Sequence, residues 1–299
     1  MFLGVDGGQS GTTALIGDEN GRVVAIGRAG PYSDPAGALK ALANSVREAG
    51  FQPGFHFRAA CIGLSGGPQE RAREVILADH YFITHDAMIA LAGATGGDSG
   101  VIVIAGTGSI AFGRNAAGRT ARAGGWGYIF GDEGGAFDLV RQALRAILRQ
   151  EEGWGPPTAL KELLLGASGA ADANDLLHRL YTDEYPRARI ASFAPLVGEA
   201  AQSGDMVAGD ILKGAAQSLA LCAAAVRRQL FRPAENVFLS YTGGVFRNPV
   251  VLERFRMLAE LEEGNQVSAP RYGPASGALL EAYRIAGIRC TLSHVPPEK

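Results

Sequence analysis

Glycine and hydroxyl residues are concentrated in the segment GVDGGQSGTT, which runs from Gly4 to Thr13. Glycine leaves backbone N–H groups open to close approach and hydroxyls add further donors, so such a turn suits the oxygens of a phosphate group. The segment IAGTGS, 104–109, repeats this composition. Neither is a Walker loop, because the first lysine of the chain is Lys40, and neither is a dinucleotide fingerprint, because a strand and not a helix is expected after Ser10. A plain hairpin remains the alternative for each segment taken alone.

Two aspartates stand where an apolar strand is expected to end. Asp6 precedes the first glycine turn, where a carboxylate can hold Mg²⁺ directly or through water. Asp86, in the sequence THDA, likewise ends a strand and begins a helix. The alternatives are structural, since aspartate commonly caps turns and helix N-termini. His85 is expected to be structural.

The densest glycine cluster is GGWGYIFGDEGG, 124–135. It combines close backbone approach, one tryptophan and an acidic pair at the start of a helix. Sugars are bound by this combination of an apolar wall and hydrogen-bond acceptors, although a tryptophan in a glycine-rich corner can also be packing.

The hydrophobic periodicity predicts an α/β chain in which these segments connect strands to strands or helices. The expected strands are 2–6, 12–16, 22–27, 58–64, 81–84, 101–105, 110–114 and 236–241, and the expected helices are 36–49, 69–77, 87–94, 136–151, 171–181, 189–202, 205–230 and 249–262. Strand, glycine hairpin, strand and turn occur near residue 2 and again near residue 101. This weak repeat predicts two related halves.

Length and composition favour a protein that acts on small molecules. The 299 residues suffice for about two domains, and a formal net charge of −2 argues against a general nucleic-acid or acidic-membrane binder. The three cysteines are far apart in the sequence and are expected to be reduced, and the five histidines show no zinc-ligand spacing. No signal-peptide pattern opens the chain, so a cytoplasmic location is expected.

Taken together and in order, GVDGGQSGTT, THDA, IAGTGS, GGWGYIFGDEGGAF, TGGV and PRYGPASGALL resemble the N-acetylglucosamine kinase group of the BadF/BadG/BcrA/BcrD ATPase family, within the sugar kinase/Hsp70/actin superfamily. The resemblance implies two ribonuclease-H-like α/β lobes with a nucleotide cleft between them. The expected limits are 1–97 for the N-terminal lobe and 98–283 for the C-terminal lobe, with a C-terminal helix at about 284–299 that packs back on the first. It also implies ATP and Mg²⁺ as cofactors, a small-molecule sugar substrate, no nucleic-acid or membrane partner, and a homodimer.

The resemblance assigns roles to residues that match the motifs. Asp86 would be the catalytic base that accepts a proton from the sugar hydroxyl, and Asp6 would assist Mg²⁺. The nucleotide-binding residues would be Gly7, Gly8, Ser10, Thr12, Gly106, Thr107, Gly108, Gly243 and Gly244. The sugar-binding residues would be Ser33, Asp34, Asp86, Ser109, Gly125, Trp126, Gly127 and Asp132.

Departures from the family pattern bear on the substrate. Gln9-Ser10-Gly11 replaces a more usual Gly-Thr-Lys, and Asp34 stands where Asn is usual. A carboxylate at 34 could pair with an ammonium group, so glucosamine competes with N-acetylglucosamine as the expected substrate. Two other functions stay open: an activator ATPase that serves an iron–sulfur cluster, which the scattered cysteines disfavour, and a non-catalytic sugar sensor.

Overall fold

The computed structural model describes residues 1–8, 11–31, 35–52, 54–65 and 70–298. The chain divides into two compact units. Unit 1 comprises 1–102, 116–118 and 269–299, and unit 2 comprises 103–115 and 119–268. These limits differ from the expected 1–97 and 98–283, because the last helix, α10 (Pro274–Ile285), packs on strands of unit 1.

Unit 1 is built on a five-stranded sheet of order β3-β2-β1-β4-β5. The strands and helices of this unit are β1 (Phe2–Gly8), β2 (Gly11–Gly17), β3 (Val23–Ala29), α1 (Pro35–Glu48), β4 (His56–Leu64), the 3₁₀ helix η1 (Glu70–Glu74), β5 (Leu77–His85), α2 (Asp86–Thr95) and α10. β1, β2 and β3 form an antiparallel meander, whereas β4 and β5 run parallel to β1. The carboxyl ends of β1, β4 and β5 therefore meet at one edge of the sheet.

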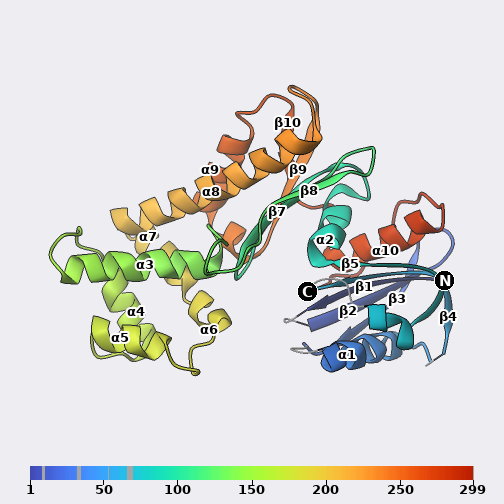
Figure 1. The fold of residues 1–299 in the computed structure, drawn as a ribbon, viewed down its shortest axis with the longest axis horizontal. Helices are drawn as coiled ribbons and strands as arrows, with labels where there is room; N and C mark the ends of the chain where they lie inside the picture. The colour runs from blue at the N-terminus through green and yellow to red at the C-terminus, as the bar shows by residue number, and fades with distance from the viewer. Residues whose placement is uncertain (9–10, 32–34, 53, 66–69, 299) are drawn as a thin grey trace. The chain divides into compact units, whose positions relative to one another are not determined.

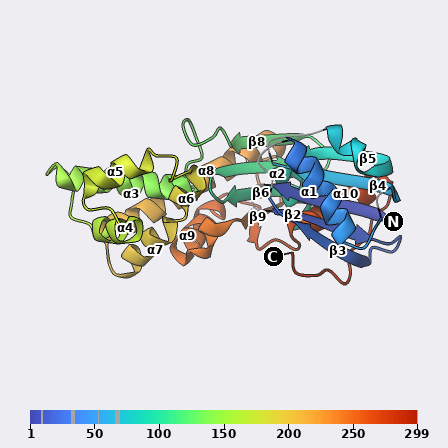
Figure 2. The same cartoon turned by 90° about the horizontal axis from the view of Figure 1, so that it is seen from below.

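Alternation along β1 directs its side chains to two different layers. Leu3 and Val5 join the cluster that contains Leu42 and Val46 of α1. On the other face, a Cβ added at Gly4 would lie 2.5 Å from the Cα atom of Leu279 in α10, so only glycine lets this helix approach the strand. Figure 1 shows α1 and α10 on opposite faces of the sheet, and Figure 2 shows α1 crossing it.

A second five-stranded sheet, of order β10-β9-β6-β7-β8, belongs to unit 2 apart from residues 100–102 at the start of β6. Its strands are β6 (Gly100–Ala105), β7 (Ser109–Arg114), β8 (Thr120–Gly124), β9 (Val237–Thr242) and β10 (Asn265–Ser268). Read from β8 to β10 and numbered within the unit, the strands come in the order third, second, first, fourth, fifth. The strands of unit 1, read from β3 to β5, have the same order. The expected two-part α/β architecture with related halves is confirmed.

Helices fill the long connection between β8 and β9. They are α3 (Ala136–Glu151), α4 (Leu160–Ser168), α5 (Ala173–Leu180), α6 (Arg187–Ala191), α7 (Ala194–Gln202) and α8 (Met206–Leu230), and η2 (Gly244–Arg247) and α9 (Pro249–Ala259) follow β9. Among the described residues, no helix combines the length and apolar character needed to cross a membrane.

Three expected helices differ from those observed. Within the helix expected over 69–77, the structure has the short 3₁₀ helix η1, and Leu77 begins β5. The helix expected over 189–202 is two helices, because Pro195 has no N–H to donate to the carbonyl of residue 191. The C-terminal helix lies at Pro274–Ile285 and not at 284–299. Pro274 suits a first helical position, and Gly287, with φ of +75°, follows its end.

Candidate active site

The first glycine segment forms the β1–β2 hairpin of unit 1. Gly7 pairs with Thr12 and Gly8 with Gly11. A Cβ at Gly8 would lie 2.7 Å from the hydroxyl of Ser65, so the end of β4 packs directly on the hairpin. The Thr12 hydroxyl is buried and points to the carbonyl of Gly30, 3.5 Å away. The candidate residues Ser10, Ser33 and Asp34 lie outside the described residues.

Asp6 lies in β1 and Asp86 directly follows β5, at the edge of the sheet where the carboxyl ends of β1, β4 and β5 meet. Asp6 is level with Gly63 of β4 and, through it, with Thr84 of β5. Because β4 lies between β1 and β5, the backbones of these two strands run about 10 Å apart. A single ion chelated by Asp6 is therefore not expected to have Asp86 as a second direct ligand.

Asp86 is exposed and is the first residue of α2. The N-cap position is held by His85, whose Nδ1 accepts a hydrogen bond from the Met88 amide at 3.3 Å. Asp86 Oδ1 accepts from the Ala87 amide at 2.8 Å, and Oδ2 accepts from the Ser65 hydroxyl at 3.3 Å. Ser65 thus contacts both the hairpin and the candidate base. The sequence interpretation missed this role, although a serine directly after an apolar strand was visible.

In unit 2, the second hairpin is attached to the start of α3. The carbonyl of Gly106 accepts from the Ala136 amide at 2.8 Å, and the carbonyl of Thr107 accepts from the Phe137 amide at 3.1 Å. These two bonds satisfy amides that a helix N-terminus leaves without intrahelical partners. A Cβ at Gly106 would meet nothing within 4 Å, so the backbone is open to close approach at this residue, whereas Gly108 packs against Asp132 and Arg187.

The segment GGWGYIFGDEGG, 124–135, which we call the GGWG segment, is hydrogen-bonded to the same hairpin. Ser109 donates from its hydroxyl to the carbonyl of Glu133 at 2.7 Å, and its own carbonyl accepts from the Gly125 amide at 3.0 Å. Trp126 is 67% exposed, so it is not a core residue. Gly125 and Gly127 have φ values of +69° and +82°, which explains why glycine occurs at both positions.

Asp132 occupies an unusual position in this segment. Its φ is +61°, an uncommon conformation for a non-glycine residue, and only 5% of the residue is exposed. Its carboxylate forms an ion pair with the guanidinium of Arg187, the first residue of α6. The sequence interpretation gave Arg187 no role, because 55 positions separate the two residues.

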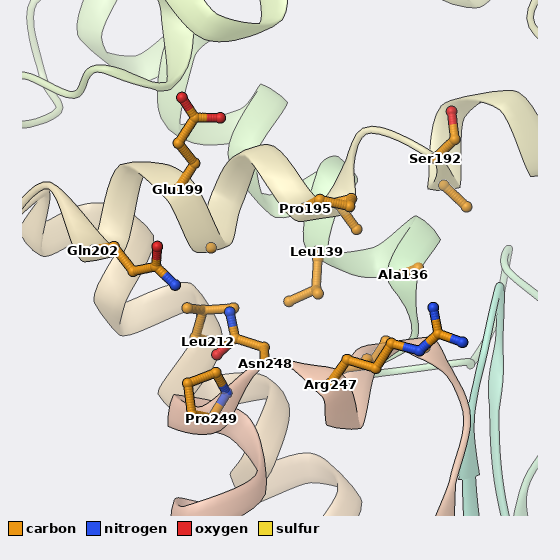
Figure 3. A pocket seen from close by; sticks show the side chains of 15 residues that line it. Ala136, Leu139, Ser192, Pro195, Glu199, Gln202, Leu212, Arg247, Asn248 and Pro249 are labelled. Carbon is orange, nitrogen blue, oxygen red and sulfur yellow. The ribbon is translucent and has the colours of Figure 1, made fainter.

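A cavity of about 680 Å³ opens beside the hairpin within unit 2. It is lined by residues of α3, α7, α8 and the segment after β9, and Figure 3 shows Leu139 and Leu212 in it, with Asn248 and Gln202 at one end. Ala136, which donates to the hairpin, lines this cavity, as does Gly244. The neighbouring Gly243 has φ of +108° and packs on Ala105 at the end of β6. The cavity therefore adjoins both the second hairpin and the pair Gly243 and Gly244.

One thiol near the site, that of Cys222, has a shifted pKa. Burial, and then the carboxylate of Glu133, raise the pKa of the Cys222 thiol, which is therefore neutral at pH 7. Among the residues that the structure describes, no group of three or more His, Cys, Asp or Glu side chains could hold a metal ion.

Comparison with known proteins identifies the family of this chain. The BadF/BadG/BcrA/BcrD ATPase family matches residues 3–282. The chain belongs to this family, as the sequence motifs predicted.

Individual relatives include sugar kinases. An N-acetylmuramic acid/N-acetylglucosamine kinase of Clostridium acetobutylicum is 37% identical over 198 residues, which cover 64% of this chain and 65% of that protein. This chain thus spans just under two thirds of that relative. An N-acetyl-D-glucosamine kinase of Dictyostelium discoideum is 27% identical over 94% of this chain and 97% of its own. A solved structure titled as a putative N-acetylglucosamine kinase of Chromobacterium violaceum has a TM-score of 0.72 at 27% identity, with 93% of this chain and 97% of that chain covered.

Proposed function

We propose that the protein is an ATP-dependent kinase that phosphorylates an amino sugar, such as N-acetylglucosamine or glucosamine, at its 6-hydroxyl. The observation that carries this proposal is the continuity, within unit 2, of a cavity, a glycine hairpin and the GGWG segment. The family membership and the kinases among the relatives support it.

The cavity is assigned to the nucleoside of ATP. Its volume of about 680 Å³ is within the range usual for small-molecule sites. Leu139 and Leu212 offer an apolar surface for the base, and the amides of Gln202 and Asn248 offer donors and acceptors. Since Ala136 joins the cavity to Gly106, the phosphates would extend over the Gly106–Gly108 hairpin. The Gly7–Gly8 hairpin is assigned to phosphate as well.

The sugar is assigned to the GGWG segment, with Asp86 as the base. Trp126 offers an exposed ring, and Asp132 offers a carboxylate acceptor for hydroxyl groups. Asp86 would orient the 6-hydroxyl and accept its proton as the oxygen bonds to the γ-phosphorus and ADP leaves. Phosphoryl transfer has a loose transition state, so alignment and charge neutralisation supply most of the rate enhancement.

Mg²⁺ fits the residues present. The ion is usually held by one or two carboxylates together with substrate phosphates, and Asp6 is a carboxylate at the phosphate hairpin. When bound, Mg²⁺ would neutralise charge on the phosphate oxygens. Asp6, for its part, would fix the position of one ligand oxygen.

The proposal is tested by coupled ADP release from MgATP with glucosamine, N-acetylglucosamine, N-acetylmuramic acid, N-acetylmannosamine and glucose. Release that depends on an amino sugar, with the product identified as a 6-phosphate by NMR, supports it. Release that no sugar stimulates indicates an ATPase of another kind, and the absence of release indicates a sensor. A homodimer in the cytoplasm remains a prediction, and light scattering of the purified protein tests the dimer.

A further inference from the structure

Three arginines contact the GGWG segment from different elements. Arg187 of α6 pairs with Asp132, and the guanidinium carbon of Arg122, on β8, lies 4.3 Å from the centre of the Trp126 ring. Arg141 of α3 donates to the carbonyl of Tyr128 at 2.8 Å. Asp138, which follows the segment, is also partnered, since it accepts from Arg141 at 2.7 Å.

The guanidinium of Arg187 is fixed at the wall of this site. A Cβ at Gly108 would lie 2.5 Å from Arg187 Nη2, which puts the cation against the second hairpin. The rings of Tyr128 and Phe137 lie 5.3 and 6.0 Å from its central carbon. About one third of the side chain is exposed (35%), so the charge is still felt by a ligand.

The pairing changes what Asp132 can recognise. A free carboxylate would attract an ammonium group, but the carboxylate of Asp132 is buried and paired with Arg187. The guanidinium is the more exposed partner of this pair, 35% against 7% for the carboxylate, so an ammonium group brought to the segment meets the cation first and is repelled by it. A neutral acylamino group meets no such repulsion, and a carboxylate on the sugar is attracted.

We propose that Arg187 is a specificity residue, which makes the sugar site select N-acylated amino sugars, including those that carry a carboxylate, over amino sugars with a free ammonium group. This inference rests on the proposed kinase function and narrows its substrate class. It opposes the expectation, based on Asp34, that glucosamine competes as a substrate.

The test compares kcat/KM for N-acetylglucosamine, N-acetylmuramic acid and glucosamine in the wild type, Arg187→Gln and Arg187→Lys. Arg189→Gln is the matched control, because Arg189 is on the same helix and stacks on Tyr185 instead, with its central carbon 4.0 Å from that ring. We expect the preference for the acylated sugars over glucosamine to fall roughly tenfold in Arg187→Gln, as expected for the loss of one nearby charge, and to be kept in the other two variants.

A second measurement needs no variant. The amine of glucosamine loses its proton near about pH 8, as α-amino groups do, so in the wild type the preference for N-acetylglucosamine should decrease from about pH 6.5 to about pH 9. The charged groups that face the segment are Arg122, Glu133, Asp138, Arg141 and Arg187.

The outcomes separate the two proposals. If no sugar stimulates ADP release by the wild type, the kinase proposal fails, and this inference fails with it. If the wild type is an active kinase but prefers glucosamine, or has a ratio independent of pH, the inference alone is overturned. An unchanged ratio in a folded Arg187→Gln protein also overturns it.

Discussion

The hydroxyl of Ser65 donates to Asp86 Oδ2 over 3.3 Å, which connects the end of β4 to the first turn of α2. The other oxygen of Asp86 accepts from the Ala87 amide. Both oxygens are thus directed by neighbouring donors, while the side chain remains exposed. This is a suitable arrangement for a base that must meet a substrate hydroxyl in one orientation.

Replacement of Asp86 by Asn should lower the phosphotransfer rate roughly 10²–10⁴-fold, because the amide cannot accept the proton of the hydroxyl. ATP affinity should stay nearly unchanged. Steady-state kinetics and titration calorimetry with a non-hydrolysable ATP analogue measure the two effects. Ser65→Ala, which removes only the orienting hydrogen bond, serves as the comparison and should lower the phosphotransfer rate less than Asp86→Asn does. Near-normal turnover of folded Asp86→Asn would remove Asp86 from the base role.

Much of the fold could be predicted because its central strands are apolar and end in glycine turns, as β1 and β6 do. The strands β8 and β10 could not. Their sequences, TARAG and NQVS, are short and mostly polar or small, and they lie at sheet edges, where their pairing with β7 and β9 defines them.

The sequence predicted only those parts of the candidate site whose residues are close together in the chain. Glycine hairpins and the GGWG segment are contiguous in sequence, so their composition indicates their use. The partners of the carboxylates are not contiguous: 21 positions separate Ser65 from Asp86, and 55 separate Asp132 from Arg187. Tertiary packing brings these partners together, and a single sequence gives no direct signal of it.

Filling the cavity should weaken nucleotide binding without harming the fold. A Cβ at Gly244 would meet nothing within 4 Å, so Gly244→Leu projects into open space beside the proposed nucleoside site. We expect KM for ATP to rise at least about tenfold, since the base loses apolar contacts of roughly this worth. Gly209→Leu is the matched control, because Gly209 is also open and does not line this cavity. Equal effects of the two variants on KM would argue against the assignment.

The contact between α3 and the second hairpin should tolerate no extra atom. A Cβ at Gly135 would lie 2.8 Å from the backbone of Gly108, which cannot move aside as a side chain can. Gly135→Ala should lower the free energy of unfolding by about 1–3 kcal/mol, as overpacking does. Urea denaturation without ligands measures this. Gly106→Ala should have a smaller effect because its Cβ meets nothing, and a similar loss in both variants would contradict the steric explanation.

The stability of unit 2 should depend on pH through Asp205, the N-cap of α8. Burial acts to raise the pKa of this carboxyl, but the Ala208 amide, the Thr158 hydroxyl and the Ala159 amide, which donate to it, together hold it below its ordinary value. A carboxyl with a lowered pKa in the folded state stabilises the fold above its unfolded pKa of about 3.9, and the stabilisation is lost as the pH falls through the folded value.

Asp205→Ala should therefore lower the free energy of unfolding by about 1–2 kcal/mol at pH 7, since an N-cap and its charge are removed. At about pH 3 the difference between wild type and variant should be smaller, because the wild-type carboxyl is then becoming protonated. Urea unfolding at both pH values measures the difference. Asp210→Ala is the control on the same helix: its pair with Lys213 is exposed and should contribute less than about 1 kcal/mol at either pH. A loss at Asp205 that is the same at both pH values would show that the lowered pKa does not contribute to stability.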